Sequence, residues 1–185
     1  MKMIKSLIAL SIFLNLNCLA QDSDSIIYWN TSVKLCWQDF KGRVPDSTEY
    51  DVAKSYIEIF TKGERSFGLP NYRIYPTFNR YKSWSKDTTI FILSHEQGHF
   101  DIGELYARKM RRSILGLREK GVESIDEYLK ILYLYNDECI KFNDQYDTET
   151  AHGVYKSKQI EWSKKIAKEL CELKKFEVDY SDYIE

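Results

Sequence analysis

The hydrophobic pattern of this 185-residue chain changes its period once, near residue 87. Before that point, short segments rich in β-branched and aromatic residues alternate with polar ones, which is typical of strands. After it, apolar residues recur at helical spacing over long stretches. Strands first and helices afterwards predict an α+β fold in which N-terminal antiparallel strands are followed by a helical half, with the helices gathered on one side.

Four segments of the first half are predicted to be strands, at 26–30, 33–40, 52–61 and 72–84. Clusters of turn-forming residues separate them, and we expect a loop at 42–48 and a turn at 62–65. Pro76 lies inside the last of these segments and indicates an edge strand or a bend, because proline cannot donate to a strand ladder.

The second half predicts three helices. The first runs over 88–117 with Asp87 as its N-cap, and a capping box at 124–127 opens a second helix that extends to about Phe142. A third begins near Val154, which leaves 144–153 as a connection. We expect the basic residues between 108 and 112 to form a solvent-exposed face.

The first predicted helix carries the string His95-Glu96-Gln97-Gly98-His99. Residues four apart share one face of a helix, so both imidazoles can bind one ion while Glu96 lies beside them. This HExxH spacing is typical of a zinc peptidase, in which the glutamate is the general base that activates a zinc-bound water. Gly98, between the two histidines, leaves room for another backbone to approach.

A catalytic zinc needs three protein ligands and one open position. The chain has three histidines in all, and His152 is the predicted third ligand. Two nearby carboxylates are alternatives for that role or for a supporting contact, Glu149 and Asp147, because zinc also accepts oxygen.

Other polar residues near the two histidine clusters are assigned supporting or structural roles. Asp101, and Glu104 one turn later, are more simply groups that support the ligands or face solvent. Tyr146 and Tyr155 flank the second cluster and are possible donors to an oxyanion. In a chain with 14 tyrosines, a purely structural role is the simpler interpretation of both.

Residues 1–20 are predicted to be a signal peptide, with basic residues, an apolar run at 7–14 and small residues at a cleavage site ending at Ala20. This predicts a secreted or periplasmic protein. Acylation at Cys18 is the alternative, which the preceding Asn17 disfavours. Residues 21–185 then form a single domain, and the apolar run is too short for a permanent membrane span.

The charge balance argues against a nucleic-acid partner. Removing Lys2 and Lys5 from the 27 basic residues leaves 25 against 28 acidic ones, a net charge of −3. Of the remaining cysteines, Cys139 and Cys171 are a plausible disulfide pair, and Cys36 would be a free, buried thiol.

Several segments together resemble the bacterial domain of unknown function 922 family, described as predicted secreted zinc-dependent proteases. The resemblance rests on 93–102, on Glu104 with 107–108, and on 146–153, and residues 35–42 and 83–84 are also similar. It implies a zincin-like fold, metal binding at His95 and His99, a catalytic Glu96 and His152 as third ligand.

The function expected from the sequence is therefore that of a secreted, zinc-dependent peptidase, one Zn²⁺ per chain, acting as a monomer on a peptide or protein substrate. Two alternatives stay open. One is a zinc-binding protein without turnover, and the other is a cell-envelope interaction domain on a zincin-like fold that presents its aromatic sheet.

Overall fold

A computed structural model of the chain describes residues 25–46 and 52–180, so the predicted signal peptide and Cys18 lie outside the described residues. The elements, in chain order, are β1 (Ile26–Tyr28), the 3₁₀ helix η1 (Trp37–Asp39), β2 (Ala53–Lys54), β3 (Ile57–Ser66), β4 (Leu69–Asn79), β5 (Trp84–Ser85), α1 (Ile90–Glu119), α2 (Ile125–Thr150), α3 (Lys156–Glu172) and the 3₁₀ helix η2 (Lys174–Phe176). The prediction of an α+β fold with antiparallel strands before the helices is confirmed.

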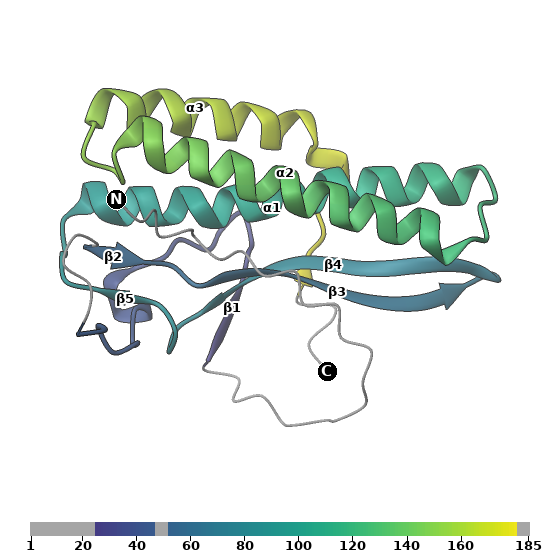
Figure 1. Cartoon of the computed structure of the whole chain (residues 1–185), viewed down its shortest axis with the longest axis horizontal. Helices are drawn as coiled ribbons and strands as arrows, with labels where there is room; N and C mark the ends of the chain where they lie inside the picture. Colours follow the sequence, from purple (N-terminus) through teal and green to yellow (C-terminus); the bar gives the residue numbers. More distant parts are fainter. Residues whose placement is uncertain (1–24, 47–51, 181–185) are drawn as a thin grey trace.

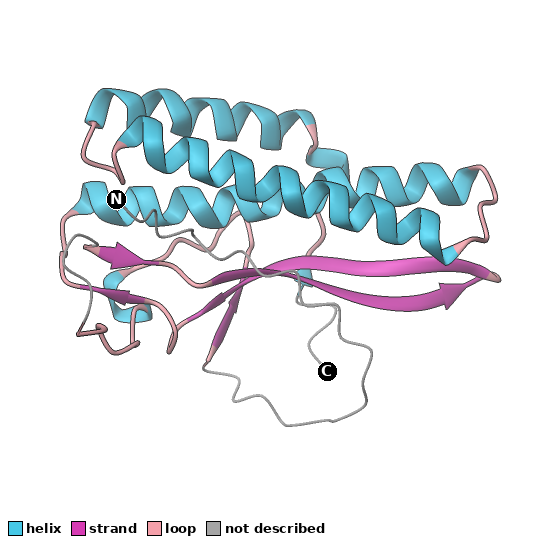
Figure 2. Cartoon of the chain, in the orientation of Figure 1, coloured by secondary structure: helices cyan, strands magenta, loops and turns pink. Residues whose placement is uncertain are grey.

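The helices lie on one side of the strands (Figure 2). The long helix α1 is the central element, because it packs against β3 and β4 on one side and against α2 and α3 on the other (Figure 1). The main core fills the space between these layers and contains Ile59, Ile74, Ile102, Leu105, Met110, Leu132 and Ile166. In the part of the chain that the structure describes, no helix is both long and apolar enough to cross a bilayer.

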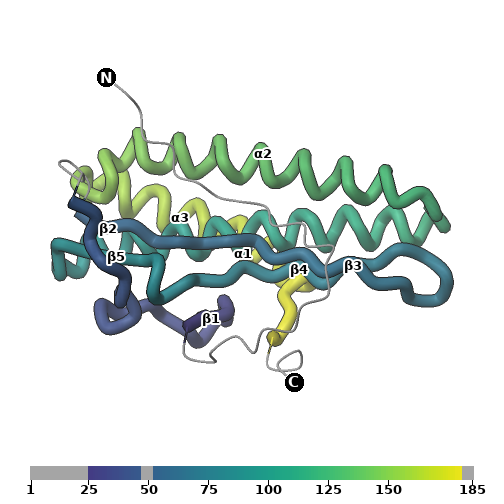
Figure 3. The backbone as a smooth tube through the Cα atoms, turned by 60° about the horizontal axis from the view of Figure 1, so that its bottom comes forward, coloured from purple at the N-terminus to yellow at the C-terminus, as the bar shows by residue number. Residues whose placement is uncertain are grey.

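A long hairpin of β3 and β4 runs along the helices, and β2 and β5 lie at one end of it (Figure 3). The three-stranded sheet has the order β1-β4-β3 and β2 pairs with β5 separately, all antiparallel. Phe67 and Gly68 close the hairpin with positive φ angles of 53° and 81°, as a two-residue type I′ turn requires. The turn predicted at 62–65 is wrong, since Gly63 pairs with Tyr72 inside the ladder.

Three of the predicted strands are not formed as expected. The segment 52–61 is divided between β2 and β3, which belong to different sheets. Residues 33–40 contain no strand, because the Asp39 carboxylate accepts from the backbone N–H of Cys36 at 2.8 Å and closes a local turn around η1. The segment 72–84 is divided after Asn79, whose side-chain oxygen accepts from the N–H groups of Tyr81 and Lys82. The two residues of β5 that follow this turn pair with β2.

Pro76 lies in the central strand β4, not at an edge. Its carbonyl accepts from the N–H of Trp29, just past the end of β1. A residue's N and O point to the same side of an antiparallel strand, so the missing N–H of Pro76 falls where β1 has already ended. The ladder between β3 and β4 therefore loses nothing.

One predicted helix boundary is confirmed and two are displaced. Asp87 is not the N-cap of α1, because its Oδ1 accepts from the N–H of Thr89 at 2.5 Å and Thr89 itself precedes the helix. Ser124 is the N-cap of α2, as predicted, but without a side-chain capping bond. The largest error is the end of α2, which continues to Thr150 instead of stopping near Phe142.

The basic segment of α1 is only partly exposed. Arg108 and Arg111 lie on the buried face and both form ion pairs at 2.8 Å with Glu104, which is completely buried. The expectation of a solvated face is wrong for these two arginines, because a buried carboxylate requires cations beside it.

The cysteine pairing is also wrong, since Cys36, Cys139 and Cys171 are all free thiols. Cys139 is buried in the main core, whereas Cys171 is exposed on α3. Cys36 is exposed as well, and not buried as expected, and its thiol donates to the Asp39 carboxylate at 3.2 Å.

Candidate metal centre

Two helices bring three ligand atoms together. His95 and His99 lie one turn apart on α1, and Asp147 lies on the last turns of α2. The Nε2 atoms of the two histidines are 3.1 Å apart, and Oδ1 of Asp147 lies 3.1 Å from that of His95 and 2.9 Å from that of His99. The three atoms therefore form a nearly equilateral triangle.

The size of this triangle matches a zinc site. With metal–ligand bonds of 2.0–2.1 Å, the ligand atoms of a tetrahedron lie about 3.3 Å apart. The three observed separations are within 0.4 Å of that edge, before any adjustment on binding. Two imidazole nitrogens and one carboxylate oxygen are a donor set that Zn²⁺ commonly takes.

Two amide side chains fix the proton of each imidazole on Nδ1. Asn143 on α2 places Oδ1 2.6 Å from Nδ1 of His99, and Gln159 on α3 places Oε1 3.1 Å from Nδ1 of His95. Each amide is oriented by its own donors, because Asn143 Nδ2 donates to the Cys139 carbonyl at 2.8 Å and Gln159 Nε2 donates to the Tyr146 hydroxyl at 2.5 Å. Both Nδ1 atoms must therefore donate, which leaves lone pairs on both Nε2 atoms.

The triangle thus holds three acceptors that face one another, and they need a cation or a proton between them. Burial lowers the pKa of the His99 imidazole, but the Asp147 carboxylate outweighs this and raises that pKa to about 9. In the same pair, burial raises the pKa of Asp147, but the attraction to His99 outweighs burial and the net effect lowers that pKa. The carboxylate is therefore ionised. The centre attracts positive charge.

The ring of Tyr146 packs against both histidines. Its ring stacks on that of His95 at 4.6 Å between centroids, and its hydroxyl donates to the His95 carbonyl at 3.1 Å. A Cβ on Gly98 would lie 2.1 Å from this hydroxyl oxygen, so only glycine fits there. The expected close approach at Gly98 is therefore made by a side chain and not by a backbone. Tyr146 is completely buried and its hydroxyl is already bonded, which favours a supporting role over oxyanion stabilisation.

The buried stripe of α2 explains why its end was missed. Cys139, Asn143, Tyr146 and Thr150 recur at helical spacing and all are buried. Asn143, Tyr146 and Thr150 carry polar groups, so a search for apolar periodicity ends the helix too early. Neither Asn143 nor Gln159 was predicted to belong to the site. The helical spacing of Asn143, Tyr146 and Thr150 could have indicated a polar helix face directed at the histidines.

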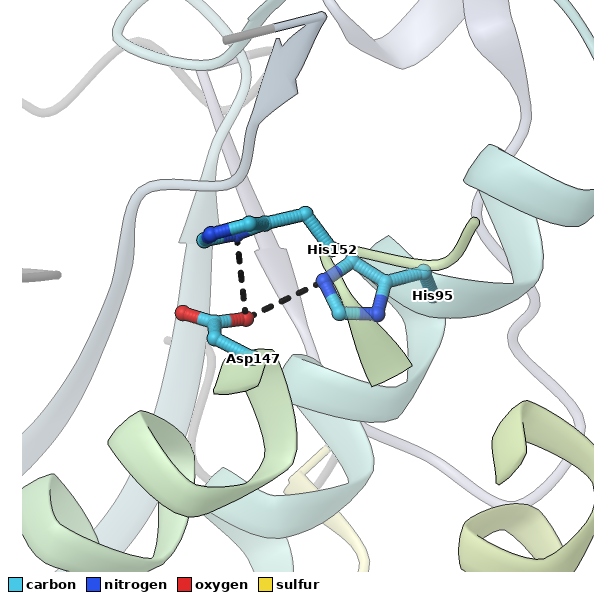
Figure 4. Close-up of side chains that lie close together, drawn as sticks. All are labelled: His95, Asp147 and His152. Atoms are coloured by element: carbon cyan, nitrogen blue, oxygen red, sulfur yellow. Dashed lines mark hydrogen bonds and ion pairs between the residues drawn. The ribbon is translucent and has the colours of Figure 1, made fainter. Parts of the chain in front are cut away.

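His152 lies at the rim of this centre, after the end of α2. Ala151, His152 and Gly153 have successive positive φ angles of 47°, 53° and 84°, so the chain folds back sharply over α1. Gly153 packs on His95, since a Cβ there would lie 2.8 Å from the His95 Cβ. The His152 side chain is 67% exposed and its Nδ1 lies 3.7 Å from Oδ1 of Asp147. Figure 4 shows Asp147 between His95 and His152, and one ligand atom from each of the three lies within 4.8 Å of the others.

The remaining predicted residues are not brought to the triangle. Glu149 is exposed and its carboxylate accepts from Gln145 and from the Trp162 indole. Asp101 accepts from the Trp29 indole and from Gln97, both at 2.8 Å. Tyr155 is 59% exposed just before α3. Glu104 belongs to the buried arginine cluster.

Glu96 is buried beside the two histidines, with 4% of its surface exposed. Its Oε2 accepts a 2.6 Å hydrogen bond from the hydroxyl of Ser55, which lies between β2 and β3. Nothing in the sequence pattern singled out Ser55, because the contact joins residues 41 positions apart.

Comparison with known proteins adds one finding. The model of a family described as bacterial protein of unknown function (DUF922) matches residues 69–153. This segment runs from the start of β4 to the glycine after His152, and so contains the three triangle residues and Glu96, but neither Ser55 nor Gln159. No curated protein and no solved structure matches the chain.

Proposed function

Because the chain belongs, through residues 69–153, to the bacterial DUF922 family of unknown function, we propose its function from the site itself. We propose a zinc-dependent peptidase with a zincin-like centre on α1 and α2. In this proposal His95, His99 and Asp147 hold the ion, and Glu96 is the general base. Secretion by the signal peptide predicted at 1–20 is part of the same proposal, with a peptide or protein as the substrate.

One observation carries the metal assignment. Two histidines whose Nδ1 protons are held by amide oxygens direct their Nε2 lone pairs at each other and at an ionised carboxylate, at 2.9–3.1 Å. Three acceptors at such distances repel one another unless a cation or a proton lies among them, and a proton joins only two of them whereas a metal ion can bind all three. A buried triangle of this size therefore favours a divalent ion over a purely structural hydrogen-bond cluster.

Each residue then has a defined task. A bound zinc ion supplies Lewis acidity, which makes water acidic near neutral pH and polarises a carbonyl oxygen. Asn143 and Gln159 hold the protons on Nδ1 of His99 and His95, so that both Nε2 atoms stay available. Glu96 takes a proton from the attacking water and returns it to the leaving amine. Since Ser55 bonds Oε2 of Glu96, we assign this transfer to Oε1.

The third ligand that we propose differs from the one the sequence favoured. Asp147 Oδ1 lies close to both Nε2 atoms, whereas His152 is largely exposed and lies 3.7 Å from that oxygen. We therefore propose Asp147 as the third ligand. His152 at the rim then contacts the substrate or its oxyanion.

A second candidate function follows from the same neighbourhood. If His152 turned inward and bound as a fourth protein ligand, the tetrahedron would be closed and the zinc would be structural. The grouping of His95, Asp147 and His152 within 4.8 Å favours this candidate, which corresponds to a zinc protein without turnover. The aromatic sheet would then be the interaction surface of a cell-envelope protein.

Metal content and two ligand variants separate the candidates. We expect the purified protein to contain one zinc per chain, and Asp147→Ala to lose it while His152→Ala retains it. In the structural alternative both variants lose zinc. A protein that binds no zinc when loaded with a molar equivalent contradicts both candidates.

The peptidase step has its own test. Glu96→Gln should keep zinc bound and lower kcat on a mixed peptide library by about 10²–10⁴-fold. Glu104→Gln is unsuitable as a control, because Glu104 balances two buried arginines. Glu149→Gln is the matched control, since its exposed carboxylate accepts only from neutral donors of α2 and α3 in the contacts described, and it should cleave like wild type. Hydrolysis by Glu96→Gln at the wild-type rate would remove the general base from the proposal.

A further inference from the structure

The strand layer reaches the metal centre through one residue. Ser55 lies where the chain passes from β2 in the two-stranded sheet to β3 in the three-stranded sheet. Its hydroxyl donates to Glu96 Oε2 at 2.6 Å, and Glu96 is buried on the first turns of α1. Figure 1 shows β2 beside this end of α1. A short hydrogen bond to a buried carboxylate is among the stronger contacts of a protein interior.

The backbone on both sides of Ser55 is held in place. Lys54 is paired with Trp84 in the ladder of β2 and β5. Tyr56 donates its N–H to the Ser83 hydroxyl at 2.8 Å, and its carbonyl accepts from the N–H of Asn79 at 2.9 Å. Ser55 is therefore presented from a rigid position, as a supporting contact to a functional group must be.

Ser83 is itself anchored from a third segment. It is completely buried, and its carbonyl accepts from the N–H of Gly42 at 2.7 Å. A Cβ on Gly42 would lie 2.7 Å from that same oxygen, so only glycine allows this approach. Segments 35–42 and 83–84, which the metal ligands do not use, thus meet at the support behind Ser55.

From these contacts we propose that Ser55 is a positioning residue, which fixes the carboxylate of Glu96 beside the metal centre. Ser83 and Gly42 form the support that holds Ser55. The inference rests on the proposed function, because positioning matters for catalysis only if Glu96 transfers a proton. The hydrogen bond from Ser55 to Oε2 restrains the side-chain rotations that would carry the Glu96 carboxylate away from the metal centre.

A double-mutant cycle tests the contact without using activity. Ser55→Ala, Glu96→Ala and the double variant are unfolded thermally as full chains, with zinc bound and again after chelation. We expect Ser55→Ala to lower Tm by about 2–4 °C in the presence of Glu96 and to have little effect in its absence. Ser85→Ala is the matched control, since its hydroxyl bonds the backbone of Val52 and Asp87 and its effect should add to that of Glu96→Ala.

The kinetic part of the test asks what the contact does. We expect Ser55→Ala to lower kcat by about 10-fold or more with KM and zinc content unchanged, and Ser55→Thr to restore kcat because it keeps the hydroxyl. Additive Tm shifts in the cycle, or a wild-type kcat in Ser55→Ala, overturn the inference. A zinc-loaded wild type that cleaves no peptide contradicts the proposed function instead, and the cycle then still decides whether Ser55 fixes Glu96.

Discussion

Nε2 of His99 lies 2.9 Å from Oδ1 of Asp147, although the two residues come from different helices. Neither side chain is fully exposed, with 12% and 15% of their surfaces accessible, so the attraction between them is only weakly screened by solvent. In the zinc-free protein a proton on His99 satisfies the carboxylate. In the proposed zinc complex the ion would take the position of that proton, so metal binding and protonation would compete with each other.

The pairing of His99 with Asp147 predicts how the stability of the zinc-free protein depends on pH. Burial lowers the pKa of His99, but Asp147 raises it to about 9, above the ordinary value of 6.5. Because the pKa of His99 is higher in the folded protein than in the unfolded chain, the interaction with Asp147 stabilises the fold fully below pH 6.5. This stabilisation is lost as the pH rises through about 9. Titration of the imidazole by NMR after chelation measures the pKa directly. A value near 6.5, or no decrease on Asp147→Asn, contradicts the pairing.

The hydrogen bond between Asn143 and Nδ1 of His99 predicts that a neutral amide contributes to zinc affinity. Asn143→Leu keeps the volume of this buried side chain but removes the oxygen that holds the Nδ1 proton of His99. Zinc affinity should fall by about 10–100-fold, measured by competition with a chelator. Gln145→Leu, two residues on at an exposed position of α2, is the control and should bind zinc normally. An unchanged affinity in Asn143→Leu would show that the amide does not set the tautomer.

Two glycines of α1 predict opposite effects of the same substitution. Gly98→Ala places a Cβ against the Tyr146 hydroxyl, so we expect a loss of about 1–3 kcal/mol in the free energy of unfolding. Gly116→Ala meets no atom within 4 Å and should gain up to about 1 kcal/mol from helix propensity. Urea unfolding of both variants gives the comparison. Equal effects at the two positions would mean that Tyr146 does not pack on the HExxH turn.

The three cysteines predict a pattern of thiol reactivity. Cys36 and Cys171 are exposed, whereas Cys139 is buried and burial raises the pKa of its thiol. In a chain that begins after residue 20, a thiol reagent should label two cysteines in the folded protein and a third only on unfolding. Cys139→Ala should show the same two labels when folded. A disulfide between Cys139 and Cys171 would leave a single reactive thiol and contradict the free state.

The sequence allowed the type and order of the elements to be predicted, because hydrophobic period reports local geometry directly. It did not allow the end of α2 to be predicted. The inward face of that helix carries Asn143, Tyr146 and Thr150, which look like surface residues until their partners on α1 are known. The turn at Phe67 and Gly68 was missed for a related reason, since Gly63 looked equally suited to a turn before strand register was known.

By itself the sequence determined that two histidines and a glutamate share one turn of a helix, since spacing along a helix fixes which side chains are neighbours. Only the tertiary structure decided what meets them. Asp147 reaches both Nε2 atoms because α2 continues for two more turns than its apolar pattern indicates, and Ser55 reaches Glu96 because two sheets meet beside α1. Contacts between distant segments depend on how whole elements pack, and packing is not encoded in local spacing.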